Sequence, residues 1–438
     1  MKRFTTVAVL LVLLVLLGGI SAQAQRVQLR FQTSVYVEEP HKVALDALKA
    51  AYEKLNPDVE IVFYGTGYAD FWDRLTTEII SGTEADIIQL YPHQISQYAA
   101  LRPGDGAFAV LNDKIIGTEF ENLIGQAECM YKGNYVGLSS YAWGVTGLFY
   151  RKSVLDEAGI DVNEIKTLNE WADVVAELTK DTDGDGRIDQ YGFGIVLGNH
   201  PFVADEWYRM VARPVSGGIY FPDGEAGPYT PERVNASHPG NVWAAKFWQD
   251  LLFEKKVSPT FTPDKKDVRE YFWNGSVAFN MDGPWFVGMT REYDEAVLED
   301  TGLIPHLPIE YNGQLHTPTS AFYPLVNVIS DNSPHKEEAW EFVKWMASPE
   351  AQELVALCGM IPSNPEYSES EAYKEAYPMN SLFVEFLEGY ILVNDPAIPE
   401  LGELTDIMIN AAQRMFIQGM DADTVLNDAA EQMKNVFR

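Results

Sequence analysis

The sequence predicts an α/β protein of two lobes, each a mostly parallel sheet flanked by helices, joined by crossing hinge segments. Three observations support this fold class. Strand-like and helix-like stretches alternate along the chain, its 438 residues are too many for one hydrophobic core, and no Pro-, Gly- or Ser-rich linker divides it. The lobes are therefore expected to be connected by strands that cross between them, not by a flexible tether.

The first lobe opens with a β-α-β-α-β series. Apolar residues alternate as in strands over 27–31 and 59–63, and a buried strand is expected at 85–90. Helical spacing fits residues 45–55 and 70–81. Single helices between strands indicate a largely parallel sheet that is covered on both faces.

The second lobe repeats this alternation. Thr167 and Glu170 form a capping-box pattern ahead of a helix around 171–179. The other expected elements are strands at 147–150, 191–197 and 276–281 and helices at 241–253 and 265–273.

The last third of the chain is expected to be mainly helical. A helix is predicted from Ser333, with Pro334 at its first position. Two more are predicted at 401–418 and 422–436, with Gly419 as the stop between them.

The first 24 residues have the pattern of a signal peptide. Lys2 and Arg3 precede an apolar run over 7–20, and residues 22–24 read Ala-Gln-Ala, a cleavage pattern. No second apolar run of about 18 residues follows, and no Cys near the cleavage site offers a lipid anchor. We therefore expect a soluble periplasmic protein, although a Gram-positive or archaeal source stays open.

The net charge limits which partners are expected, and the two cysteines raise the question of a disulfide. The formal net charge of −32 repels phosphate backbones and anionic lipids, so partners of nucleic acid or membrane surface are disfavoured. The acidity otherwise indicates solubility or a salty or hot habitat. The two cysteines, Cys129 and Cys358, could form a disulfide in an exported protein or lie apart as small buried residues, and the sequence leaves both alternatives open.

Aromatic residues gather where strands are expected to end. Ligands of open α/β sheets bind beyond the carboxyl ends of strands, and sugars need flat apolar faces with a few fixed polar groups. The candidate ligand-binding residues are Tyr64, Thr66, Tyr68, Trp72, Tyr91, His93, Tyr141, Trp143, Trp207, Asp282, Trp285 and Phe322. A Gly-Pro turn releases Trp285 from its strand, which favours it most. Other tryptophans lie in helical patterns and are expected in the core: Trp171, Trp243, Trp248, Trp340 and Trp345.

Residues 181–189 resemble a calcium-binding loop. Carboxylates occupy positions 1, 3, 5 and 9, Gly186 occupies position 6, and a backbone carbonyl serves position 7: Asp181, Asp183, Asp185, Asp189 and Arg187. Gly192 stands where the bidentate Glu would be, and a strand follows instead of a helix. The loop is therefore either a structural Ca²⁺ site or an Asp/Gly turn that needs no metal.

Signatures of catalysis are weak or missing. No His-Glu-x-x-His pair and no phosphate-binding P-loop occurs, and residues 137–141 fail the Gly-x-Ser-x-Gly pattern. The chain is not expected to be an enzyme, and no cofactor besides the calcium ion is expected.

In their order these segments resemble the extracellular solute-binding proteins of sugar ABC transporters, the maltose-binding-protein-like family. The stretches that carry the resemblance are 131–138, 147–152, 168–171, 189–193, 275–285, 339–346 and 359–362. The resemblance implies the periplasmic binding protein fold, a monomer whose lobes close over a carbohydrate, and docking of the closed form on a membrane permease. It also implies that Trp285 is a stacking aromatic and that 64–68 is the ligand loop of the first lobe. Residues 317–322 depart from the family in lacking its frequent Gly-rich pattern.

The two-lobed fold that the resemblance implies also gives the expected lobe boundaries. The chain is expected to cross between the lobes near Trp143, Thr319 and Gly359. After the signal peptide at 1–24, the N-terminal lobe comprises 25–143 and 319–357, and the C-terminal lobe comprises 144–318 and 358–438.

Two alternatives compete with the binding of a sugar or short oligosaccharide. Another polar solute, such as a glycerol phosphoester, would require basic residues, and the loops 64–68 and 282–286 contain none. A secreted polysaccharide-degrading enzyme would instead require two carboxylates that face each other at a fixed separation.

Overall fold

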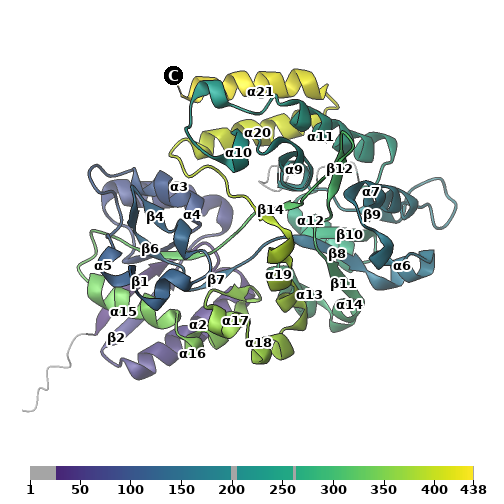
Figure 1. The fold of residues 1–438 in the computed structure, drawn as a ribbon. Coiled ribbons are helices and arrows are strands. Elements are labelled where there is room, and N and C mark those ends of the chain that lie inside the picture. The colour runs from purple at the N-terminus through teal and green to yellow at the C-terminus, as the bar shows by residue number, and fades with distance from the viewer. Residues whose placement is uncertain (1–25, 199–204, 260–262, 438) are drawn as a thin grey trace, which may run out of the picture.

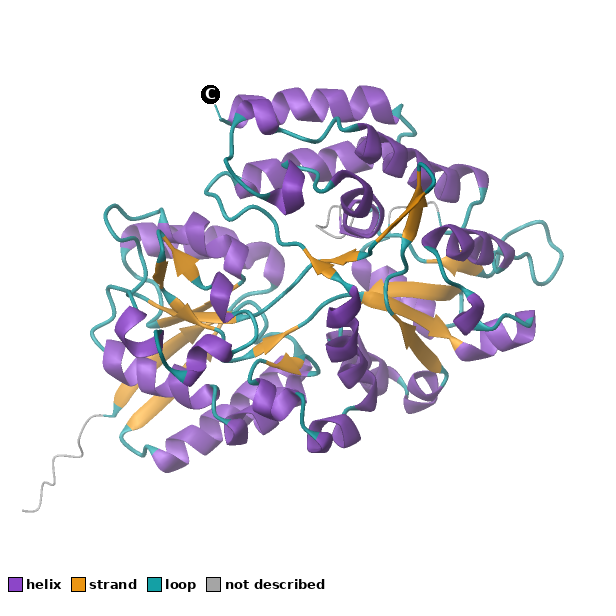
Figure 2. Ribbon diagram, viewed as in Figure 1, coloured by secondary structure: helices purple, strands orange, loops and turns teal. Residues whose placement is uncertain are grey.

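The computed structural model describes residues 26–198, 205–259 and 263–437, which form two lobes (Figure 1). Helices surround a sheet in each lobe, and short strands run between the lobes (Figure 2). The expected signal peptide lies outside the described residues. Within the described part, no helix combines the length and the apolar character needed to cross a membrane.

The first lobe is built on a five-stranded sheet in the order β2-β1-β3-β15-β6. β1 pairs in parallel with β2 and β3, while β15 runs antiparallel between β3 and β6. All strands except β15 therefore share one direction, as the sequence predicted. The strands are β1 (Val27–Gln32), β2 (Val59–Tyr64), β3 (Ile87–Leu90), β6 (Gly137–Leu138) and β15 (Val326–Ile329).

Helices cover this sheet through apolar faces. α2 buries Ala44, Leu45, Leu48 and Tyr52, and the Tyr52 ring meets Phe342 of α15 edge to face at 4.8 Å. Segments about 290 residues apart in sequence thus share one core. The helices of this lobe are α2 (Glu39–Leu55), α3 (Tyr68–Ser81), α4 (Pro92–Ala99), α5 (Asn112–Ile115), α15 (Lys336–Met346) and α16 (Pro349–Val355).

The second lobe has a four-stranded sheet in the order β11-β8-β10-β9. Again a single strand, β8, runs against the others. The strands are β8 (Gly147–Arg151), β9 (Tyr191–Phe193), β10 (Val277–Asp282) and β11 (Thr301–Ile304). The helices are α6 (Lys152–Ala158), α7 (Leu168–Glu177), the π-helix η4 (Asp205–Ala212), α9 (Arg213–Ser216), α10 (Pro222–Glu225), α11 (Pro239–Gln249), α12 (Lys265–Trp273), α13 (Trp285–Tyr293), α14 (Glu295–Glu299), α20 (Leu401–Phe416) and α21 (Ala422–Val436).

Two small sheets lie where the chain passes between the lobes (Figure 1). β7 (Ala142–Trp143) pairs with β16 (Ile361–Pro362), and β14 (Thr319–Ser320) pairs with β17 (Ile391–Leu392). Cys358 lies in the core of the first lobe. Beyond β16, the helices α17 (Pro365–Ser368), α18 (Glu371–Ala376) and α19 (Pro378–Phe386) follow, and Phe383 of α19 packs with Phe149 of the second lobe at 6.0 Å. The exact lobe boundaries stay a prediction.

Two sequence expectations are confirmed locally. The Thr167 hydroxyl accepts a 3.2 Å hydrogen bond from the Glu170 amide, and the Glu170 carboxylate accepts one of 3.0 Å from Thr167, which completes the capping box of α7. Gly419 lies between α20 and α21 with a positive φ of 66°, a conformation that favours glycine.

Two other expectations are wrong. α15 begins at Lys336, not at Pro334, because the Ser333 hydroxyl accepts a hydrogen bond from His335 and fixes a turn there. The predicted strand 191–197 ends at Phe193, because the amides of Ile195 and Val196 donate to side chains instead of to a neighbouring strand.

The cysteine alternatives are also resolved. Cys129 and Cys358 are both free thiols, and both are buried in the first lobe.

Candidate functional site

Aromatic side chains of the first lobe come together at the carboxyl end of its sheet. β3 ends at Leu90, and Tyr91 follows directly as the N-cap of α4. The Tyr91 ring stacks on His93 at 5.7 Å with an interplanar angle of 4°, and it lies 6.4 Å from the ring of Trp72 on α3. All three side chains are partly exposed. Three of the predicted ligand residues therefore form one group.

The second lobe presents Trp285 in the equivalent place, directly after β10. Its indole Nε1 donates a 2.6 Å hydrogen bond to Asp282, the last residue of that strand. The ring also lies close to two glycines, since a Cβ on Gly283 would stand 2.3 Å from it and one on Gly144 would stand 3.0 Å from it. A side chain at Gly283 would therefore force the Trp285 ring to shift.

Asp282 is fully buried and stays ionised. Arg269 donates to it at 2.8 and 3.1 Å, and Lys265 lies 3.7 Å away. Burial alone would raise the pKa of Asp282, but these two cations outweigh it and hold the pKa at about 2. Asp282 therefore positions Trp285 and is not available as an acid or a base near neutral pH.

Tyr323, on the segment that crosses back between β14 and β15, joins the two groups. Its ring meets Tyr91 edge to face at 6.1 Å and Trp285 at 6.0 Å, and the Arg209 guanidinium lies 5.5 Å from its centre. Tyr323 is partly exposed. We call Trp72, Tyr91, His93, Tyr323 and Trp285 the aromatic row, because these residues extend from one lobe to the other.

Tyr323 was missed, and its neighbour Phe322 was predicted instead. Phe322 is 5% exposed and packs on Trp143 at 5.7 Å. Successive side chains of an extended segment point to opposite sides, so one of the two faces the core and the other faces the row. That alternation is the signal in the sequence that could have identified Tyr323.

Three more predicted ligand residues are buried, which argues against direct contact with a ligand. Tyr141 bonds His41 through its hydroxyl at 3.1 Å, Trp143 donates to the Pro362 carbonyl at 3.2 Å, and Trp207 packs on Phe416 at 5.6 Å. Each is at most 1% exposed.

The loop after β2 is less clearly part of the site. The Tyr64 hydroxyl donates to Gln32 at 3.4 Å, and Arg74 covers its ring, so this side chain is engaged within its own lobe. The Thr66 hydroxyl is buried and has no hydrogen-bond partner among the described residues. The side chain of Tyr68 lies outside what the structure describes.

A buried charge cluster borders the row on the side of the second lobe. Asp395 accepts hydrogen bonds of 2.7 Å from both Arg209 and Arg213 and one of 3.0 Å from the Tyr208 hydroxyl. Burial would raise the pKa of Asp395, but Arg209 and Arg213 hold it well below its usual range. This carboxylate is therefore also fully engaged, and it offers no free acid or base.

His93 of the first lobe lies near that cluster. Burial lowers its pKa to about 4, and the positive charges of Arg209 and Arg213 add to this while Asp395 opposes it. At neutral pH the imidazole is uncharged and offers one donor and one acceptor, which suits a hydroxyl group.

One hydrogen bond joins the lobes beside the row. Asn394, next to Asp395, donates to the Glu128 carboxylate of the first lobe. Burial raises the pKa of Glu128 to about 7. The charge of this contact therefore changes near neutral pH.

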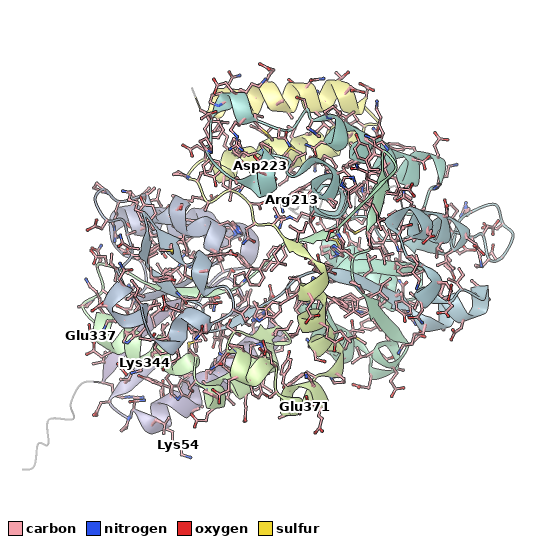
Figure 3. The ribbon with its side chains drawn as sticks, in the orientation of Figure 1. Lys54, Arg213, Asp223, Glu337, Lys344 and Glu371 are labelled. Carbon is pink, nitrogen blue, oxygen red and sulfur yellow. The ribbon has the colours of Figure 1, made fainter. Side chains whose placement is uncertain are left out.

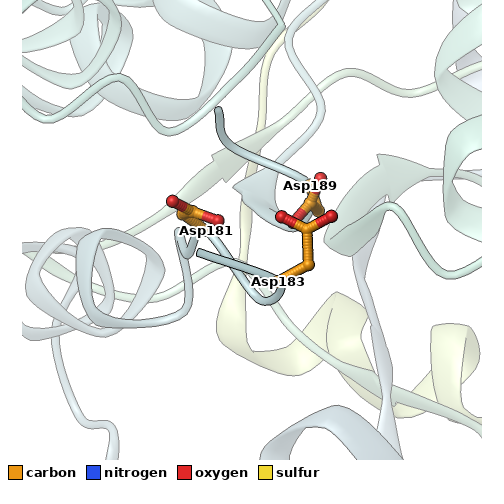
Figure 4. A group of neighbouring side chains, drawn as sticks. All are labelled: Asp181, Asp183 and Asp189. Carbon is orange, nitrogen blue, oxygen red and sulfur yellow. The ribbon is translucent and has the colours of Figure 1, made fainter. Parts of the chain in front are cut away.

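The acidic loop lies on the second lobe, at a distance from the row. The carboxylates of Asp181, Asp183 and Asp189 come within 4.8 Å of one another and are exposed (Figure 4). Asp185 is not part of this group, and its carboxylate accepts a 2.8 Å hydrogen bond from the Arg187 amide. Oxygens that bind one Ca²⁺ at about 2.4 Å lie at most about 5 Å apart, so the three carboxylates fit such an ion.

Comparison with known proteins places this arrangement in context. Residues 38–353 match the family model for bacterial extracellular solute-binding proteins. A binding protein of Brucella abortus is 24% identical over 413 residues, which is 93% of this chain and 91% of that one.

Solved structures agree with the fold. A solute-binding protein of an ABC transporter from Thermotoga lettingae, bound to α-D-tagatose, gives a TM-score of 0.77 at 19% identity and covers 94% of this chain and 100% of its own. Maltose-bound MalE3 from T. maritima also gives 0.77, at 18% identity, over 93% of this chain and 99% of its own. The predicted fold of two lobes is thereby confirmed.

Proposed function

This chain belongs to the bacterial extracellular solute-binding protein family, and on that premise we propose that it binds a sugar or a short oligosaccharide between its lobes. The observation that carries the proposal is the aromatic row, in which Tyr323 contacts Tyr91 of one lobe and Trp285 of the other. Rings of this kind stack on the C–H faces of sugars, and tagatose and maltose are the ligands of two structural neighbours.

The mechanism follows from the residues that the row connects. A ligand that contacts rings from both lobes binds the closed arrangement more tightly than the open one, and it shifts the equilibrium by that difference in affinity. The uncharged His93 would bind a hydroxyl group at one end of the row. The closed form of the protein would then deliver the sugar, unchanged, to an ABC permease from the periplasm.

The charged groups beside the row favour a neutral ligand over a phosphoester. Arg209, whose guanidinium lies 5.5 Å from the centre of the Tyr323 ring, is already paired with Asp395 at 2.7 Å. Asp282 and Asp395 are each held by two cations. The same pairing means that neither Asp282 nor Asp395 can serve as the proton donor that glycoside cleavage needs.

The test is isothermal titration calorimetry. The protein is first unfolded to release any bound ligand and then refolded, and it is titrated with mono- and oligosaccharides and with glycerol phosphoesters. Saturable binding of a sugar at about one ligand per chain, with the sugar recovered intact, supports the proposal. Binding of phosphoesters alone would remove the sugar assignment, and consumption of the sugar would replace it with an enzyme.

We also propose that Asp181, Asp183 and Asp189 hold a structural Ca²⁺. The support is the convergence of their oxygens within 4.8 Å, together with the calcium-loop spacing of the sequence. Such an ion would stabilise the turn between α7 and β9 and would take no part in binding the sugar.

A further inference from the structure

A cavity of about 720 Å³ lies on the first lobe where α2, α15, α16 and α17 meet. No member of the aromatic row lines it. Lys344, on its wall, lies on the outer part of the first lobe, far from Arg213 beside the row (Figure 3). The volume is within the range of small-molecule sites.

One wall of the cavity is aromatic. Trp345 packs against Tyr52 at 5.3 Å and stacks nearly parallel on Phe342 at 6.3 Å. These contacts hold the indole in place, and it remains partly exposed. Phe120 lines the same cavity and is fixed edge-on against Trp340 at 5.8 Å. The site therefore offers rigid ring surface to a ligand.

The remaining charge of the cavity is negative. It is lined by three carboxylates and one cation: Glu119, Glu341, Glu366 and Lys344. The ammonium of Lys344 lies 2.9 Å from Glu341, so these two neutralise each other. Among the described residues, nothing forms an ion pair with the carboxylates of Glu119 and Glu366. Two negative charges are thus left beside the aromatic wall.

Tyr52 also lines the cavity. Burial, and then the charges of Glu341 and Glu338, raise the pKa of Tyr52 to about 12. The Tyr52 phenol is therefore protonated at neutral pH.

We propose that this cavity binds a small organic ammonium ion, with the cation against Trp345 and its charge balanced by Glu119 and Glu366. A cation gains both from the ring face and from the carboxylates, whereas a neutral sugar gains only from the rings and an anion is repelled. The site is separate from the aromatic row, so it would fill independently of the transported ligand.

The test uses choline chloride, titrated into the full chain by NMR or calorimetry at low ionic strength. The uncharged analogue 3,3-dimethylbutan-1-ol, which has the shape of choline, is titrated in parallel. Choline is expected to bind saturably and the alcohol is not. Trp345→Ala should weaken binding by about tenfold, the size of one cation–π contact. Glu371→Gln, an exposed carboxylate outside the cavity, should leave binding unchanged.

A second variant guards against loss of folding. Glu119 and Glu366 are both exposed, so Glu119→Gln/Glu366→Gln should fold normally and still lose most of the choline affinity. Equal binding of choline and the alcohol, or unchanged affinity in both variants, would overturn the proposal. Loss of choline binding in Trp285→Ala would move it to the aromatic row and would also overturn it. None of these outcomes bears on whether a sugar binds between the lobes.

Discussion

The two lobes hold their parts of the aromatic row in different ways. In the second lobe, Trp285 is anchored to Asp282, a buried carboxylate that Arg269 and Lys265 keep ionised. In the first lobe, Trp72 and Tyr91 lie against each other as rings, and the backbone amide of Tyr91 donates to the side chain of Gln94 at 3.2 Å. Trp285 is thus tied to buried charge, whereas the contacts described for Trp72 and Tyr91 are ring packing and one backbone hydrogen bond.

This difference indicates which lobe is preorganised for the ligand. A buried ion pair with satisfied hydrogen bonds is costly to disturb, so it fixes side chains before any ligand arrives. Ring contacts of 5 to 7 Å are worth much less each and allow adjustment. We therefore expect the second lobe to act as a rigid platform and the first to adapt as it closes.

The largest expected effect comes from breaking the platform. Asp282→Asn leaves Arg269 and Lys265 buried beside a neutral group, which should lower the free energy of unfolding by about 3 kcal/mol or more. Denaturant titration measures this. Asp423→Asn, which removes a partner of the exposed Lys246, is the control and should change little. Equal stability of the two variants would show that the platform does not depend on charge.

The next effect concerns the rings themselves. Trp285→Ala should weaken sugar binding by about 30-fold, or roughly 2 kcal/mol, because a fixed ring at the centre of a site contributes most. Trp72→Ala should cost less, since its lobe can adjust. Calorimetry on both variants makes the comparison, with Trp243→Phe, which lies on α11 away from the row, as the control. A larger loss in Trp72→Ala would reverse the assignment of platform and adaptable lobe.

The contact between the lobes predicts a pH dependence. The pKa of Glu128, which accepts a hydrogen bond from Asn394, is raised from an ordinary value of 4.5 to about 7 by burial. A raised carboxyl pKa means that the native, joined state holds its proton more tightly. The stability that this group contributes is therefore complete below pH 4.5 and is lost as pH rises through 7, by up to about 3 kcal/mol.

Unfolding curves between pH 5 and pH 8 measure this effect. Stability should fall with pH in the wild type, and the fall should be smaller in Glu128→Gln. Asn394→Ala tests the partner, since without its hydrogen bond the buried carboxylate should be still less favourable. Identical pH profiles of stability in wild type and Glu128→Gln would show that Glu128 does not cause the pH dependence.

The smallest expected effect is on stability and comes from the acidic loop. Because this loop lies away from the aromatic row, changing it should not affect sugar binding. Removing Ca²⁺ with a chelator should lower the unfolding temperature by about 1 °C, the shift that about 1 kcal/mol produces in a chain of this size. Sugar affinity should not change. Asp181→Asn/Asp189→Asn should abolish the response, and a chelator effect that survives in this variant would place the ion elsewhere.

Local patterns in the sequence predicted the fold well, because strand alternation, helical spacing and the capping box of Thr167 are each contained in a few residues. The same reasoning located Tyr91 and Trp285, which directly follow strands. It could not separate these from Trp143 and Trp207, because an aromatic residue at a strand end or in a helix can face either the core or solvent. Burial depends on what packs opposite, and that is not local.

Two kinds of residue were missed by reasoning from the sequence, those paired with a distant segment and one next to a predicted residue. Arg209 and Asp395 are 186 residues apart, and their pairing depends on the return of the chain after β17. Tyr323 differs from Phe322 only in the side of an extended segment on which it lies. A register error of one residue exchanges the two.

The strand order of the first sheet has a consequence for how the molecule is made. β15 lies between β3 and β6, so residues 326–329 complete a sheet whose other strands all precede residue 139. The whole second sheet is synthesised in between. The first sheet therefore stays incomplete while some 190 residues are synthesised, and the first lobe should not mature before the second sheet has been made.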